Sequence, residues 1–187
     1  MFDTLDFNAK ALCEDFDVTL QIHRQGLGKI QFIPSAIART QDPGTFRDFI
    51  RQITRWNRGV MQMFFKHRIG SRASRIDAYL IYQIAQNLMF ASLFFVALPA
   101  ITILSGSLLY LAIAFVSDVM TVGMFTLFAM QRTKRPRIIQ SFPFTYALRW
   151  IQLLIFLKSF AEVFILHRYR LAGGGWETVT RRTNQTV

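Results

Sequence analysis

The sequence has few of the residues that build disulfides and metal sites. Cys13 is its only cysteine, so an intrachain disulfide is excluded, and so is a zinc site made of several cysteines. The three histidines, His23, His67 and His167, lie far apart and do not have the spacing of metal ligands. We therefore predict no metal site within this chain.

Acidic residues are also scarce, with 11 Asp and Glu against 22 Lys and Arg and a formal net charge of +11. Apolar residues, in contrast, make up 52% of the chain, and 19 residues are Phe. Nucleic-acid binding would account for the basic charge but not for the long apolar runs. Basic cytoplasmic loops between membrane helices account for both, because Lys and Arg hold short loops on the cytoplasmic side. We expect a lipid bilayer, and no nucleic acid, as a partner.

Composition divides the chain into four parts. They are a polar front, a basic amphipathic helix with its linker, a pair of apolar stretches, and a basic loop followed by a third helix and a tail, over residues 1–44, 45–77, 78–130 and 131–187. The predicted fold class is therefore a helical membrane protein with a partial α/β front.

The front has the pattern of the end of an α/β domain. A helix is predicted over residues 14–25, because Gly26 can take the left-handed conformation that ends a helix. Short strands are predicted over residues 29–33, where apolar residues alternate with polar ones before Pro34, and over residues 36–39.

Residues 45–66 have helical periodicity with two distinct faces. Apolar side chains recur at Phe46, Phe49, Ile50, Ile53, Val60 and Phe64. Arginines recur at the same spacing on another side, at Arg47, Arg51, Arg55 and Arg58. This pattern predicts an amphipathic helix whose cationic stripe lies on a membrane surface.

Two apolar stretches, residues 79–104 and 108–130, are each long enough to cross a hydrocarbon core of about 30 Å. Basic residues lie on both outer flanks of the pair, whereas the turn at residues 105–107 carries no charge. The pair is thus predicted to form a hairpin in the cell (inner or plasma) membrane, with the turn outside and the polar front in the cytoplasm.

Asp118 interrupts the second stretch. Its insertion cost of about 2.5–3.5 kcal/mol is smaller than the summed contribution of the surrounding Leu, Ile, Val and Phe residues. We expect Asp118 either to be functional, as acids inside membranes often are, or to pack against a polar partner such as Thr121 or Gln131.

A third apolar segment, residues 142–168, contains Lys158 and Glu162 near its centre. Their i,i+4 spacing allows them to pair. The segment is predicted either to lie along the membrane interface or to span it with its polar stripe against other helices. Basic residues after it favour a cytoplasmic tail.

Two short motifs carry chemistry. Glu14 and Asp15 stand at a helix start, where the dipole favours a negative charge, and an ionised carboxylate can act as general base toward a sugar hydroxyl. Gln52, Arg55 and Trp56 have i, i+3 and i+4 spacing and so share one helical surface. Arg offers donors for phosphate oxygens, and Trp offers a flat face for a sugar ring.

These residues resemble a known family. Residues 11–26, Pro34 and residues 52–59 are similar to the family 2 inverting glycosyltransferases, in the membrane-bound processive branch that contains cellulose, chitin, hyaluronan and poly-N-acetylglucosamine synthases. That branch has a Thr-Glu-Asp motif followed by Gln-x-x-Arg-Trp and then membrane helices. Here Cys13 stands in place of the usual Thr, Gln52 follows Asp15 by 37 positions, and the tail at residues 175–183 is loosely similar.

The resemblance implies a role for each matching residue. Asp15 corresponds to the base that deprotonates the acceptor, and Glu14 to its supporting acid. Gln52, Arg55 and Trp56 correspond to residues that line the acceptor end and the donor diphosphate. The donor is expected to be a nucleotide sugar, UDP-linked, and the acceptor a growing glycan.

The resemblance also implies parts that this chain does not supply. The family's nucleotide-binding half carries an Asp-x-Asp motif for Mg²⁺ or Mn²⁺, and we expect it to lie outside these 187 residues. The chain is then the C-terminal part of an A-type glycosyltransferase domain with its membrane helices, inactive alone and dependent on that half or on a partner subunit. The alternative is a non-enzymatic membrane subunit that docks a partner through its amphipathic helix.

Overall fold

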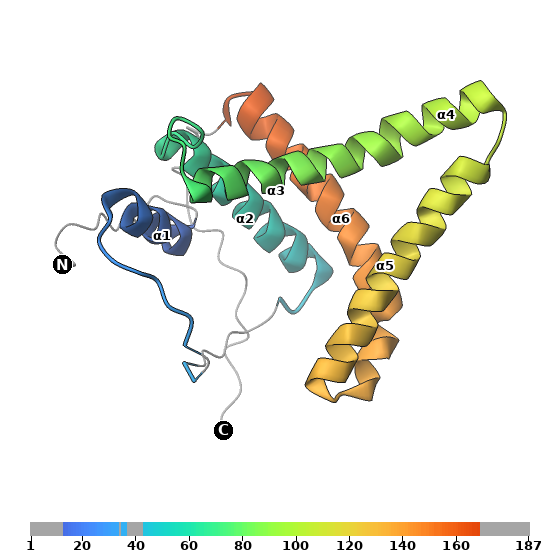
Figure 1. Ribbon diagram of the computed structural model, residues 1–187, viewed down its shortest axis with the longest axis horizontal. Coiled ribbons are helices and arrows are strands. Elements are labelled where there is room, and N and C mark those ends of the chain that lie inside the picture. The colour runs from blue at the N-terminus through green and yellow to red at the C-terminus, as the bar shows by residue number, and fades with distance from the viewer. Residues whose placement is uncertain (1–12, 34, 37–42, 169–187) are drawn as a thin grey trace. The chain divides into compact units, whose positions relative to one another are not determined.

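The computed structural model describes residues 13–33, 35–36 and 43–168 (Figure 1). Their regular elements are α1 (Glu14–Gln25), α2 (Phe46–Lys66), α3 (Arg75–Ser92), η2 (Leu93–Ala97), α4 (Leu98–Ser105), α5 (Leu109–Thr133), η3 (Pro136–Ser141), α6 (Phe142–Phe160) and η4 (Ala161–Ile165). All of these are helical; η2 and η4 are π-helical and η3 is a 3₁₀-helix.

The chain forms two compact units. One consists of Met1–Ala73 with Ile155–Val187, and the other consists of Ser74–Leu154. The boundary between them falls inside α6, so this helix belongs to both.

Helix α1 has the bounds that the sequence predicts. Three acidic residues, Glu14, Asp15 and Asp17, occupy its first turn, where the helix dipole favours negative charge. Gly26 ends the helix with φ 64° and ψ 30°, a left-handed conformation that glycine adopts without a steric penalty.

The strand predicted over residues 29–33 is wrong for this structure, which has no strand among the residues it describes. Instead the segment is irregular, and Phe32 is 86% exposed. A lone extended segment leaves its backbone N–H and C=O groups to water, and a strand needs a neighbour to pair with. The second predicted strand and the similar tail at 175–183 lie largely or wholly outside the described residues.

Helix α2 confirms the predicted amphipathic helix. Thr45 caps its start: the Thr45 hydroxyl accepts from the Asp48 backbone N–H at 3.1 Å and donates to the Asp48 carboxylate at 2.7 Å. Met61 and Met63 of α2 and Leu20 of α1 are among the most deeply buried side chains of the first unit and belong to its apolar core.

The second unit contains the two long apolar helices. Residues 75–105 form one continuous helical stretch of 31 residues through α3, η2 and α4, and α5 has 25 residues. Both are long and apolar enough to cross a membrane, and most of their side chains are not buried within the protein. The π-helical turn η2 ends at Ala97, two residues before Pro99. Proline cannot complete the ordinary α-helical hydrogen bond four residues back, and a widened turn accommodates it.

The first half of α6 packs against both long helices of this unit. Arg149 of α6 pairs with the buried Asp118 of α5, and its guanidinium lies 4.6 Å from the ring centroid of Phe90 in α3. The Trp150 ring contacts Phe94 edge-on at 5.2 Å. The polar partner of Asp118 is therefore Arg149 rather than Thr121 or Gln131, because α6 brings an arginine to this point of α5.

We predict that the Asp118–Arg149 pair stabilises the packing of α6. Asp118→Asn leaves the guanidinium without its counter-charge, and we expect the free energy of unfolding to fall by about 1–3 kcal/mol. Thermal unfolding of the purified protein, followed by tryptophan fluorescence, measures this loss. The double variant Asp118→Leu/Arg149→Met removes both charges and should recover most of it. If the double variant instead loses the sum of what Asp118→Leu and Arg149→Met lose separately, the two residues do not interact.

Candidate active site

The two motifs that carry chemistry meet in the first unit. The Sγ of Cys13, at the start of α1, donates to the backbone carbonyl oxygen of Trp56 in α2 at 3.8 Å, across 43 residues of sequence. This contact joins the start of α1, where Glu14 and Asp15 stand, to the backbone of α2 at Trp56.

The two acids of the first motif lie on the surface. Glu14 and Asp15 are exposed. One carboxylate oxygen of Asp15 accepts from the backbone N–H of Phe16 at 2.8 Å. The Asp15 backbone carbonyl accepts from the Thr19 hydroxyl at 2.8 Å. The Asp15 carboxylate is thus held at the positive end of α1 and is open to an incoming hydroxyl.

The second motif presents a mixed surface on α2. Gln52 and Arg55 are half-buried, and Trp56 is 47% exposed. An indole exposed to this extent offers an apolar face while its backbone carbonyl stays engaged with Cys13.

The pKa of the Cys13 thiol depends on burial and on the charges around it. Burial is the largest cause that raises the pKa of this thiol from 9.0 to about 11. The negative charge of Asp15 and, to a smaller extent, that of Glu14 also raise the pKa, whereas the positive charge of Arg55 lowers it. Both acids and the arginine are therefore close enough to act on one buried atom.

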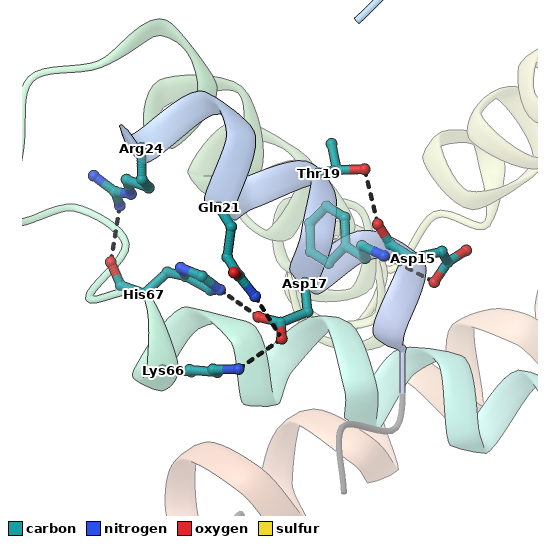
Figure 2. A network of polar contacts seen from close by, with 8 residues as sticks. Asp15, Asp17, Thr19, Gln21, Arg24, Lys66 and His67 are labelled. Atoms are coloured by element: carbon teal, nitrogen blue, oxygen red, sulfur yellow. Dashed lines mark hydrogen bonds and ion pairs between the residues drawn. The ribbon is translucent and has the colours of Figure 1, made fainter. Parts of the chain in front are cut away.

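A buried carboxylate fixes the other side of α1 to the end of α2 (Figure 2). Asp17 is 1% exposed, and its two oxygens contact Lys66 Nζ and His67 Nε2 at 2.6 Å each. Gln21 Nε2 donates to the same carboxylate at 3.2 Å. Burial raises the pKa of Asp17, but the hydrogen bonds and charges of Lys66 and His67 outweigh it, so the pKa lies below the ordinary 3.8. The stability that this contact contributes is present above that value and is lost as the pH falls through the lowered pKa.

Sequence reasoning missed this network. Lys66 is one of the basic residues that precede the first apolar stretch, and His67 lacks the spacing of a metal ligand, so neither pattern indicates a contact with Asp17. One signal was present: residues two apart on a helix lie about 200° apart around its axis, so Asp15 and Asp17 cannot both face outward from a helix packed on one side.

Comparison with known proteins identifies the family. The sequence profile described as glycosyl transferase family group 2 matches residues 3–157, most of the chain. The chain belongs to this family.

A curated member gives a further comparison. The chain is 29% identical over 172 residues to a protein named probable glycosyltransferase YdaM from Bacillus subtilis (strain 168), an alignment that covers 82% of this chain. It covers 40% of YdaM, so the chain spans less than half the length of that relative. No solved structure gives a significant match.

In this glycosyltransferase chain, a second ion pair anchors the motif helix. Arg58 lies one turn after Arg55, and its Nη2 and Nε contact one oxygen of Glu162 in η4 at 2.5 and 2.8 Å. The Phe164 ring packs on Phe65 at 5.1 Å between centroids. The i,i+4 spacing of Lys158 and Glu162 allows them to pair, but Glu162, in the π-helical turn η4, contacts Arg58 of α2 instead.

Within residues 13–33, 35–36 and 43–168, no group of three or more His, Cys, Asp or Glu side chains is placed to hold a metal ion. Two of the acidic residues have other partners: Asp17 binds Lys66 and His67, and Glu162 binds Arg58. These residues do not fit a metal centre.

We predict that the rate at which iodoacetamide alkylates the Cys13 thiol depends on the charges of both motifs. Only the thiolate reacts, so with a pKa of about 11 the rate should keep rising throughout pH 8–10 without a plateau. Asp15→Asn should lower this pKa and Arg55→Gln should raise it, because the two charges act in opposite directions. An exposed thiol in the Cys13→Ser/Ser71→Cys variant is the control. Identical pH profiles for the parent and both charge variants would show that the motifs lie apart.

Proposed function

We propose that this chain is the acceptor-side and membrane part of a processive, inverting glycosyltransferase that extends a polysaccharide from a UDP-linked sugar, with Asp15 as general base. The observation that carries the proposal is the Cys13–Trp56 contact, which brings the two motifs together in a member of a glycosyltransferase family. Family membership favours this function over a non-enzymatic docking subunit.

The proposed reaction uses the exposed carboxylate at the start of α1. Asp15 takes the proton of the acceptor hydroxyl, whose oxygen attacks the anomeric carbon of the donor. The bond from that carbon to the diphosphate oxygen breaks, the nucleoside diphosphate leaves with the electron pair, and the configuration inverts. Glu14, beside Asp15, supports its charge and position.

The surface of α2 would hold the two substrates around this base. Trp56 offers an exposed ring face on which the terminal sugar of the acceptor packs. Arg55 supplies charged donors to the leaving diphosphate, and Gln52 supplies an amide for sugar hydroxyls. A divalent ion, Mg²⁺ or Mn²⁺, belongs to the proposal with ligands outside this chain; it would neutralise charge on the leaving group, and no step above passes through it.

The membrane arrangement follows from the two long helices. We place α3–α4 and α5 across the cell membrane as a hairpin, with α2 at the cytoplasmic interface. Basic residues flank both outer ends of the hairpin, at Arg68, Arg72, Arg75, Arg132, Lys134, Arg135 and Arg137. Glu162 and Phe164 contact α2, which supports a cytoplasmic position for the chain after η4.

The general base is tested by Asp15→Asn in the full-length membrane protein. This variant loses the proton acceptor but keeps its shape, so we expect turnover to fall by about 10²–10⁴-fold. Binding of uridine diphosphate, measured by calorimetry, should stay at the parent level. Turnover close to that of the parent would refute the assignment of Asp15.

Topology is tested with single cysteines in a Cys13→Ser background. An impermeant thiol reagent applied to intact cells should label Ser107→Cys at the hairpin turn. Thr133→Cys and Leu166→Cys should be labelled only after the cells are opened. Labelling of Leu166→Cys from outside would mean that α6 crosses the membrane completely.

A further inference from the structure

A buried ion pair on the inner side of α1 stands close to the proposed base. Asp17 is two residues from Asp15 on the same helix, and its carboxylate contacts Lys66 and His67 at 2.6 Å each (Figure 2). Both partners stand where α2 ends, since Lys66 is its last residue and His67 is its C-cap. The Asp17 carboxylate therefore binds two side chains whose positions along the chain are fixed by the end of α2.

Packing alone does not account for a charge at this position. Asp17 lies on the inner face of α1 with Leu20, which is fully buried, and an apolar side chain would serve such a site. Removing a carboxylate from water costs several kcal/mol, and its ion pairs repay this only with good geometry. What a directional pair adds is a unique register, because an apolar contact tolerates rotation and sliding more readily.

The register of α1 decides where Asp15 points. Residues two apart on a helix lie about 200° apart, so a helix with Asp17 turned toward α2 has Asp15 turned away from it. A rotation by one residue, about 100°, would move Asp15 off the exposed side. Two further contacts hold the ends of α1: Arg24 donates to the His67 carbonyl at 3.0 Å, and Cys13 donates to that of Trp56.

We propose that Asp17, through Lys66 and His67, is a positioning residue for the transfer reaction. It sets the rotation of α1 and its placement along α2, so that the Asp15 carboxylate stays on the exposed side of α1, where it is open to the acceptor. This inference rests on the proposed function, since Asp15 must be the base for its position to matter.

The test is a double-mutant cycle in the full-length enzyme. Asp17→Asn keeps the shape of the side chain and removes its charge. We expect kcat to fall about 10–100-fold with the donor KM unchanged, because a small displacement of a reacting group lowers the rate by this order. In the Asp15→Asn background the same substitution should have no further effect, since the base that it positions is already gone.

Matched variants separate positioning from general stability. Lys66→Gln removes one contact of the network from a side chain that is 32% exposed, and it should reproduce the selective, non-additive loss of kcat. If Asp17→Asn does not fold, the Lys66→Gln variant replaces it in the double-mutant cycle. Arg72→Gln removes an exposed positive charge six positions after Lys66 and outside the network, and it should leave kcat and KM at the parent values.

Two results would overturn the proposal. One is a further loss of kcat when Asp17→Asn is added to Asp15→Asn, and the other is a parallel loss of donor affinity, since both indicate general destabilisation. Full turnover in Asp15→Asn alone is a different result: it removes the base itself and refutes the proposed function. Full turnover in Asp17→Asn and Lys66→Gln, with Asp15→Asn inactive, refutes the positioning role alone.

Discussion

Asp17 carries a negative charge in a place that water barely reaches, and the geometry of the first unit depends on how that charge is balanced. Lys66 and His67 supply the balance from the end of α2, where positive charge is also favoured by the helix dipole. The same contacts therefore pair the buried carboxylate, place basic side chains at the C-terminal end of α2, and join α1 to α2. α1 has 12 residues, which is marginal for an isolated helix in water, so attachment to α2 also supports its helical state.

The same solution recurs in the second unit in a more apolar setting. An unpaired charge on an apolar helix is costly, and this holds for Asp118 on α5 and for Arg149 on α6. The two side chains form an ion pair, so each charge has a partner. The Phe90 ring then covers the guanidinium and adds a cation–π contact. In both units polar side chains define which helices pack together, while apolar side chains provide most of the contact area.

Local patterns were the part of the structure that the sequence made predictable. Gly26 and the first-turn acids define α1, and the spacing of arginines and phenylalanines defines α2, because helix signals reside in neighbouring residues. The motif residues could be proposed for the same reason, and the structure joins the helices that bear them through the contact of Cys13 with the Trp56 carbonyl. Partners distant in sequence were not predictable: Asp17 with His67, Arg58 with Glu162, and Asp118 with Arg149 depend on how helices pack. The predicted strand at residues 29–33 failed for a related reason, since alternation reveals a candidate strand but not a neighbour for it.

The π-helical turn η2 changes which side chains lie on one side of the helical stretch over residues 75–105. A π-turn holds one residue more than an α-turn, so everything after Ala97 is rotated by about 100° relative to a regular α-helix. Positions that share a stripe on a single helical wheel drawn through residues 75–105 therefore diverge beyond this turn. The side that meets Trp150 through Phe90 and Phe94 does not continue along α4. Substitutions in α3 and α4 should be grouped on two wheels, one for each segment, because one wheel position faces different surroundings before and after the π-helical turn.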